Sequence, residues 1–177
     1  MGRLSFHAKA HLLAMYQALQ KAATTLAATG KKIVLVRCGW HPNDFIEKAY
    51  KNAAAQDCPD LKVITLDGRQ ASERQTAWAG IDVFCSLSDN IQDTFGIVPI
   101  EAVAAGLPVV ASDWDSFKDT VRRGVEGFRI STCMAQAGLT TDPALRHAHE
   151  VDTYDMYCGH TCSLVSVDIE PTARAFV

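Results

Sequence analysis

Residues 86–112 (SLSDNIQDTFGIVPIEAVAAGLPVVAS) constrain the fold more than any other part of the chain. They read as the end of a strand, a polar loop, a short helix from Pro99 to Ala105 and a second strand. Pro99 favours a helix start, because a proline at the first helical position loses only an N–H that has no partner in the helix. The order strand, loop, helix, strand predicts a crossover connection between parallel strands.

The loop and the start of this helix form a candidate ligand site. Gly96 lets backbone approach a ligand closely, and the free N–H groups of a helix start attract anions. Asp93 and Glu101 have seven residues between them, which places one on the loop and one in the first helical turn, facing the same bound molecule. This pattern predicts a ligand that combines a phosphate with a hydroxyl-rich sugar. The alternative for either carboxylate alone is a charge that complements the helix dipole.

Residues 93–111 (DTFGIVPIEAVAAGLPVVA) resemble the signature of the retaining glycosyltransferases of family 4, which have the GT-B fold. That signature is an acidic residue, seven residues and a Glu, followed by an Ala/Gly-rich helix and a strand. The chain differs at the first position, where Asp93 stands in place of the usual Glu. The resemblance implies that Asp93 holds the donor sugar and that Glu101 accepts hydrogen bonds from both ribose hydroxyls. It also implies donor-binding contacts from Phe95, Gly96, Ile97 and Val98.

The first residues look like a second part of the family's donor site. Gly2-Arg3-Leu4 with Lys9 is similar to a Gly-Arg-Leu...Lys loop in which the Arg and the Lys hold the donor diphosphate. Five residues separate Arg3 from Lys9 where four are usual, so this assignment requires a loop with one extra residue. The alternative for Lys9 is a solvated charge at a helix start. Gly39 lies in another loop that the resemblance places near the donor.

A strand precedes the Gly-Arg-Leu loop in the family. The resemblance therefore implies that this chain is a piece of a larger protein and lacks the N-terminal, acceptor-binding domain. We interpret residues 1–177 as one Rossmann-like, nucleotide-sugar-binding domain, with residues 131–177 as an extension beyond the resemblance.

The rest of the chain alternates strands and helices, which predicts an α/β fold with a doubly wound parallel sheet. Strands are expected at Ile33–Cys38, Leu61–Leu66, Ile81–Leu87 and Pro108–Ser112. The first of these is an apolar, β-branched run, as in a strand that is buried on both faces. One helix face is expected from Leu12, Tyr16, Leu19, Ala23 and Leu26.

Two further helices carry candidate start signals. Asn43 can cap a helix that Pro59 stops, and its expected buried face is Phe45, Ile46, Ala49, Tyr50 and Ala53. Ser72 and Gln75 form a candidate capping box for the next helix. A short helix is expected near residues 117–122, and others at residues 142–150 and from residue 168 onward.

Composition excludes several classes of protein. The chain is 48% apolar and 21% charged, as in one ordinary globular domain. A net charge of −3 argues against a nucleic-acid-binding surface. The longest nearly apolar run, residues 102–111, is far shorter than the roughly 20 residues that span a bilayer, so we expect no transmembrane segment. The cysteines, which we expect to be reduced, favour a cytoplasmic protein.

The six cysteines suggest neither a disulfide framework nor a strong metal site. Cys38 and Cys85 fall in expected core strands, which favours reduced thiols. Cys158 and Cys162, with Cys133 and two histidines upstream, invite a zinc interpretation, but a second pair of ligands with zinc-knuckle spacing is missing. We therefore favour packing roles and expect no metal.

The resemblance implies the donor-binding domain of a retaining glycosyltransferase that transfers a sugar from a nucleoside-diphosphate sugar to an acceptor that the sequence leaves unidentified. In such chemistry Arg3 and Lys9 would stabilise the departing diphosphate without a metal or other cofactor. Two alternatives stay open at this point, a nucleotide-sugar epimerase domain and a nucleotide-binding module without chemistry.

Overall fold

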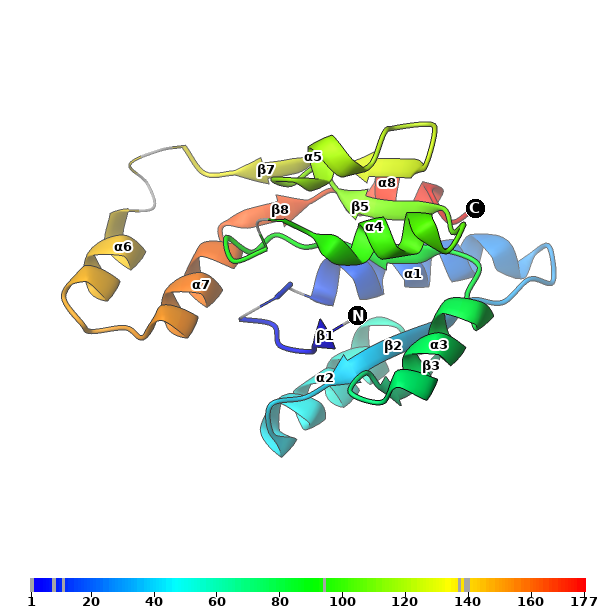
Figure 1. The fold of residues 1–177 in the computed structure, drawn as a ribbon, viewed down its shortest axis with the longest axis horizontal. Helices are drawn as coiled ribbons and strands as arrows, with labels where there is room; N and C mark the ends of the chain where they lie inside the picture. The colour runs from blue at the N-terminus through cyan, green and yellow to red at the C-terminus, as the bar shows by residue number, and fades with distance from the viewer. Residues whose placement is uncertain (1, 8, 11, 94, 137, 139–140) are drawn as a thin grey trace.

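The computed structural model describes residues 2–7, 9–10, 12–93, 95–136, 138 and 141–177 (Figure 1). Its strands are β1 (Gly2–Arg3), β2 (Val34–Trp40), β3 (Lys62–Asp67), β4 (Phe84–Ser86), β5 (Val109–Ser112), β6 (Gly127–Ile130), β7 (Thr132–Met134) and β8 (Val165–Val167). Its helices are α1 (Leu12–Ala27), α2 (Asp44–Asp57), α3 (Ala71–Gly80), α4 (Ile97–Ala104), α5 (Phe117–Thr120), α6 (Thr141–Ala148), α7 (Tyr154–Cys162) and α8 (Ile169–Arg174).

The fold is α/β, and the alternation of parallel strands with helices that the sequence predicts is confirmed. The strands are hydrogen-bonded as two parallel sheets, β1-β2-β3 and β4-β5-β6, and an antiparallel pair, β7-β8. The expectation of one continuous sheet is therefore wrong for the described strands. The physical reason is the shortness of β1, which pairs only with Gly39 and Trp40 of β2. No strand in the described part of the chain bridges β2 and β4.

The same short strand explains a second difference. We expected residues 33–38 to be buried on both faces, yet Val34 is 47% exposed, whereas Arg37 and Cys38 are each 7% exposed. Over most of its length β2 has one described strand neighbour, β3. The strand is therefore buried mainly toward its carboxyl end, near the residues that β1 covers.

Two helices join the sheets. The predicted apolar face of α1 is confirmed, since Tyr16, Leu19 and Leu26 are buried. Met15 of α1 packs against the core clusters of both sheets, and so does Phe176, which follows α8. Because both residues contact both clusters, the α1–α8 layer stabilises the arrangement of the two sheets through apolar burial. No helix among the described residues is long and apolar enough to cross a membrane.

The helix-start signals give mixed results. Asn43 caps α2 as predicted, because its Oδ1 accepts a hydrogen bond of 2.9 Å from the N–H of Ile46. The predicted buried face of α2 is wrong at Phe45, which is 74% exposed; the buried residues of α2 are Ile46, Tyr50 and Ala54.

The capping box proposed for Ser72 and Gln75 is wrong. α3 begins at Ala71, so Ser72 lies inside the helix, and the cap position is Gln70, whose side chain makes no capping bond. Glu73, in the first turn, instead accepts a hydrogen bond from the backbone N–H of Asp67. A carboxylate in the first turn also complements the helix dipole.

The helix predicted from Pro99 to Ala105 is α4, which begins two residues earlier, at Ile97. Pro99 is thus the third helical residue, a position that tolerates proline because the first turn of a helix has no internal partner for its N–H groups. The carboxyl end has the hydrogen bonds of a Schellman motif, Gly106 N to Val103 O at 2.9 Å and Leu107 N to Ala102 O at 3.0 Å.

Candidate functional site

The candidate site lies where the carboxyl ends of the parallel strands meet the start of α4, which is where open α/β sheets hold their ligands. β1 brings Arg3 opposite Trp40 at the end of β2. Beyond β1, the N–H of Leu4 donates to the carbonyl of Trp40 at 2.8 Å. In the segment that follows, Lys9 N donates to Ser5 O at 3.0 Å.

This N-terminal segment is joined to the loop that carries Asp93. The hydroxyl of Ser88 donates to the carbonyl of Lys9 at 3.2 Å, and Nδ2 of Asn90 donates to the carbonyl of His7 at 3.2 Å. Asp93 follows within the same loop, and its N–H donates to Asn90 O at 3.0 Å. The two segments that carry the predicted basic and acidic residues are therefore neighbours, although about eighty residues of sequence separate them.

Asn90 is the centre of this loop. It is fully buried, and besides its bond to His7 its Oδ1 accepts from the N–H of Gln92 at 2.9 Å. Its carbonyl accepts from Nε1 of Trp114 at 3.2 Å. Because each of these polar groups is buried and satisfied, their loss would cost more than that of a surface hydrogen bond.

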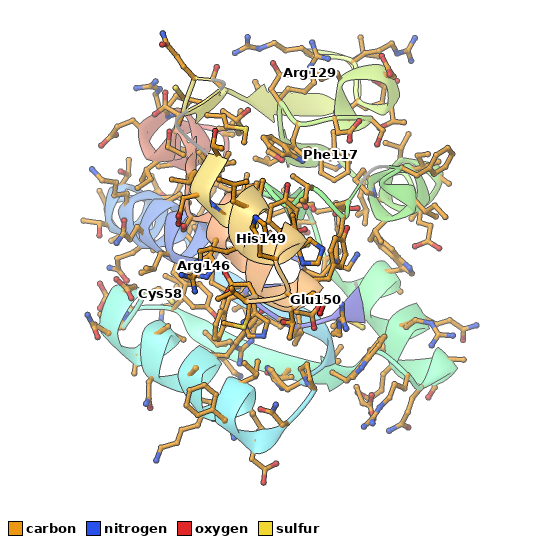
Figure 2. The ribbon with its side chains drawn as sticks, turned by 90° about the vertical axis from the view of Figure 1, so that its left-hand side faces the viewer. Cys58, Phe117, Arg129, Arg146, His149 and Glu150 are labelled. Carbon is orange, nitrogen blue, oxygen red and sulfur yellow. The ribbon has the colours of Figure 1, made fainter. Side chains whose placement is uncertain are left out.

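The start of α4 forms the other side of the candidate site. Gly96 is the N-cap residue and adopts a left-handed conformation, with φ 62° and ψ 54°. A side chain at Gly96 would overlap the ring of Phe117, which is buried and lies beside α4 (Figure 2). Ile97 and Val98 are the first helical residues, and their N–H groups belong to the first turn, where a helix leaves donors free for an anion.

The remaining predicted residues differ in burial. Phe95 and Ile97 are 66% and 58% exposed, Glu101 is exposed on the first turns of α4, and Asp93 and Val98 are half-buried. Thr94, part of the predicted loop, lies outside the described residues. Exposure leaves Phe95, Ile97 and Glu101 accessible to a ligand or to another protein surface.

Gly39 is buried against the backbone of Gly2, and its carbonyl accepts from Gly68 N at 3.1 Å. A side chain at Gly39 would overlap the carbonyl of Gly2. Gly39 therefore has a clear packing role at the point where β1, β2 and the turn after β3 converge, in addition to the donor contact that the resemblance implies.

An ion pair follows β3. Arg69 contacts the Asp67 carboxylate through its side chain, with Nη2 to Oδ2 at 2.9 Å, and through its backbone N–H, at 3.0 Å. These hydrogen bonds lower the pKa of Asp67 to about 2. The turn at the end of β3 is therefore anionic at Asp67 over the whole physiological pH range.

Sequence reasoning missed Ser88, Asn90, Ser112 and Trp114, which hold the candidate site together. The hydroxyl of Ser112 donates to the carbonyl of Ser88. A signal for these residues was available in the sequence: small polar residues occur at the ends of the two apolar strands β4 and β5. Polar groups that are buried at such positions need hydrogen-bond partners.

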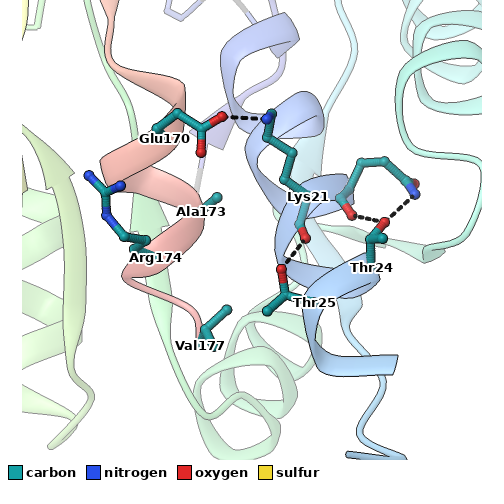
Figure 3. Close-up of a pocket in the computed structure, with 8 residues that line it drawn as sticks. Lys21, Thr24, Thr25, Glu170, Ala173, Arg174 and Val177 are labelled. Atoms are coloured by element: carbon teal, nitrogen blue, oxygen red, sulfur yellow. Dashed lines mark hydrogen bonds and ion pairs between the residues drawn. The ribbon is translucent and has the colours of Figure 1, made fainter. Parts of the chain in front are cut away.

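The two cavities that stand out lie elsewhere. One, of about 390 Å³, lies between α1 and α8, beside the Lys21–Glu170 ion pair (Figure 3). The other, of about 360 Å³, lies between α6 and α7 near Arg146 and His160. Neither is lined by a residue that the sequence predicts for the donor site.

The cysteine and histidine cluster has packing roles. All six cysteines are free. Cys158 and Cys162 are buried on α7, and His147 stacks on Tyr157 with ring centroids 5.2 Å apart. Within the described ranges, His, Cys, Asp and Glu side chains form no group of three or more that could hold a metal ion.

Comparison with known proteins identifies the family. The family described as "Glycosyl transferases group 1" matches residues 1–140. The phosphatidyl-myo-inositol mannosyltransferase of Mycobacterium leprae (strain TN) is 47% identical over 58 residues, which are 32% of this chain and 15% of that protein.

Two solved structures are similar at lower identity. The lipopolysaccharide outer core galactosyltransferase WaaB, in its apo form, is 16% identical with a TM-score of 0.47, covering 99% of this chain and 46% of that one. Anabaena HepE, in complex with UDP and glucose, is 18% identical with a TM-score of 0.45, covering 99% and 43%. This chain thus spans less than half of the length of either structure. The family match covers well over half of the chain, so the chain belongs to the group 1 glycosyltransferases.

Proposed function

We propose that this chain is the donor-binding part of a retaining, GT-B-type glycosyltransferase that uses a nucleoside-diphosphate sugar. In this proposal Arg3, Lys9 and the first N–H groups of α4 hold the diphosphate. Glu101 binds the ribose hydroxyls and Asp93 binds the donor sugar. Backbone at Gly39 and at residues 95–98 completes the donor contacts.

One observation carries the proposal. The carbonyls of His7 and Lys9 accept hydrogen bonds from Asn90 and Ser88, which brings Lys9 and the segment that follows Arg3 beside the loop with Asp93 and the start of α4. A diphosphate needs cationic side chains and oriented N–H donors, whereas a sugar needs a carboxylate acceptor. This edge of the protein supplies all three kinds of group from two adjoining segments.

The chemistry follows from this set of groups. Breaking the bond between sugar and phosphate develops negative charge on the departing diphosphate. Fixed cations and helix N–H groups stabilise that charge most strongly in the transition state, and they require no metal for it. Transfer also needs an acceptor held against the sugar. The 177-residue chain is therefore expected to bind donor without transferring sugar.

Titration calorimetry with UDP-glucose, GDP-mannose and ADP-glucose tests the proposal. Lys9→Gln is expected to weaken binding of the preferred donor by about 2 kcal/mol, the contribution of a charge-assisted hydrogen bond. Lys48→Gln is the matched control, because Lys48 is an exposed lysine of α2. Binding that is equal in the parent and Lys9→Gln, or the absence of binding to all three donors by the parent, would refute the proposed site.

A further inference from the structure

α7 packs against both segments that form the proposed donor site, although it lies outside the 140 residues that match the family. Its start is fixed by Thr153, whose Oγ1 accepts from the N–H of Met156 at 3.3 Å. Cys158, Thr161 and Cys162 are buried, so one face of the helix is covered. Figure 1 shows α7 beside the N-terminal segment.

The contact with the N-terminal segment is made at Gly159. A Cβ added to this residue would lie 2.8 Å from Cβ of His7 and 3.5 Å from its Cα. Glycine is less favourable than alanine inside a helix, so its presence near the middle of α7 is explained by this close approach. The backbone of α7 therefore packs directly against His7.

The contact with the Asp93 loop is made one residue before and three residues after Gly159. Nε2 of Gln92 donates to Sγ of Cys158 at 3.3 Å. The thiol of Cys162 lies 3.4 Å from Oδ1 of Asp89 and 3.6 Å from its carbonyl oxygen. Cys158 and Cys162 are four residues apart and therefore share one face of the helix.

These contacts form a closed arrangement of three segments. α7 touches residues 5–9 at His7 and residues 89–92 through its two cysteines, and Asn90 joins the two loops directly through its bond to His7 O. A shift of either loop away from the other would disturb its contact with α7. The position of Lys9 relative to Asp93 therefore depends on α7.

We propose that α7 is a positioning element of the donor site and that Gly159 is the positioning residue through which α7 sets the place of residues 5–9. This inference rests on the proposed function, because it assigns a role at the same site. It adds residues that no part of the sequence signature contains.

Gly159→Ala, tested in the 177-residue chain, adds one methyl group against His7. The added methyl is expected to displace residues 5–9 and to weaken the binding of the preferred nucleoside diphosphate, among UDP, GDP and ADP, by about tenfold, as expected for one lost charge-assisted hydrogen bond. Gly80→Ala is the matched control, since Gly80 ends α3 and a Cβ there meets nothing within 4 Å.

A second substitution separates positioning from general damage. His7→Gly removes the Cβ that the new methyl group meets, so it should restore binding in the Gly159→Ala background. Amide hydrogen exchange gives a reading that needs no ligand. The N–H groups of Lys9 and Gln92, both hydrogen-bonded in the parent, should exchange faster in Gly159→Ala and return to parental rates in the double variant.

The outcomes distinguish the two proposals. A parent chain that binds none of the three diphosphates overturns the proposed function and this inference with it. A parent that binds, with a folded Gly159→Ala variant that binds equally well, overturns the inference alone. Weak binding that His7→Gly does not restore also overturns it. If Gly159→Ala does not fold, Cys162→Ala, which removes the contact to Asp89 without adding volume, replaces it, and parental binding in that variant overturns the inference.

Discussion

Substitution of Gly96 by alanine tests how the start of α4 is held. Gly96 combines two constraints, a left-handed backbone and direct contact with the ring of Phe117. Gly106, at the other end of α4, has a left-handed backbone with φ 78° but no atom near its would-be Cβ. The two glycines therefore separate the cost of backbone strain from the cost of a clash.

The magnitudes follow from these two constraints. An alanine in the left-handed region costs about 1–2 kcal/mol, which both variants incur. Overpacking of a buried side chain adds about 1–3 kcal/mol, which only Gly96→Ala incurs, because Phe117 is 1% exposed and belongs to the core cluster of the second sheet. We expect destabilisation of about 1–2 kcal/mol for Gly106→Ala and about 2–5 kcal/mol for Gly96→Ala.

Urea denaturation followed by far-UV circular dichroism measures both free energies of unfolding. Phe117→Leu, combined with Gly96→Ala in a double-mutant cycle, should recover part of the lost stability, because the smaller side chain makes room for the methyl group. Equal destabilisation by the two glycine substitutions, or a cycle without coupling between positions 96 and 117, would show that the clash does not determine the position of the helix start.

Four further results are expected. Glu101→Gln should weaken donor binding by about 2 kcal/mol without changing the stability of the fold, since Glu101 is exposed and its proposed partners are ribose hydroxyls. An unchanged donor affinity in calorimetry would mean that Glu101 only complements the helix dipole. Asp93→Asn should reduce the preference for a nucleotide sugar over the bare diphosphate more than Asp93→Glu does, because Glu keeps the charge and Asn removes it; a changed melting temperature with unchanged preference would contradict sugar binding. Donor affinity should be equal with and without a chelator, and a strong loss in chelator would contradict metal-independent binding. Arg69→Ala should raise the pKa of Asp67 from about 2 toward its ordinary value of 3.8 in an NMR titration. Because the folded-state pKa of Asp67 is depressed, the stabilisation by this ion pair is complete above about pH 4 and is lost as the pH falls toward 2. The loss of stability over this pH range should therefore be smaller in Arg69→Ala. An unchanged pKa of Asp67 would exclude Arg69 as the cause of the depression.

Local sequence signals predicted the elements well where one physical requirement dominated. The apolar spacing from Leu12 to Leu26 gave α1, and the amide of Asn43 gave the start of α2. The same reasoning was wrong at Phe45, which is 74% exposed, and at Ser72, which lies inside α3 and not at its cap. Burial of α2 follows the row Ile46, Tyr50 and Ala54, which faces the first sheet, and α3 begins before Ser72.

The division into two sheets could not be predicted from periodicity. Strand patterns indicate which segments are extended but not which edges pair, since pairing depends on the length of the neighbouring strand. β1 contributes only two residues to the register with β2. The sequence therefore predicted which segments form strands, but not that these strands are divided between two sheets.

The sequence predicted which residues belong to the candidate site, but not the hydrogen bonds that bring its two segments together. The family signature covers Asp93 to Glu101, and those residues needed no structure to be singled out. The hydrogen bonds that join the site involve Ser88 and Asn90, which donate to the backbone carbonyls of residues 9 and 7, about eighty positions earlier in the sequence. Small polar residues that bond to backbone leave no periodic pattern, because the partner is a carbonyl that every residue carries.

The same reasoning applies to the cysteines of α7, for which the sequence invites a zinc interpretation but favours packing roles. A helix that packs closely against two loops needs small residues at the contact, and Cys158, Gly159 and Cys162 meet that need: the glycine admits the loop backbone, and the thiols fill small spaces while making weak hydrogen bonds. Clustered cysteines in a chain of this kind therefore indicate close packing as readily as metal binding. Which of the two applies depends on the partners that the fold supplies, and on α7 those partners are His7, Asp89 and Gln92.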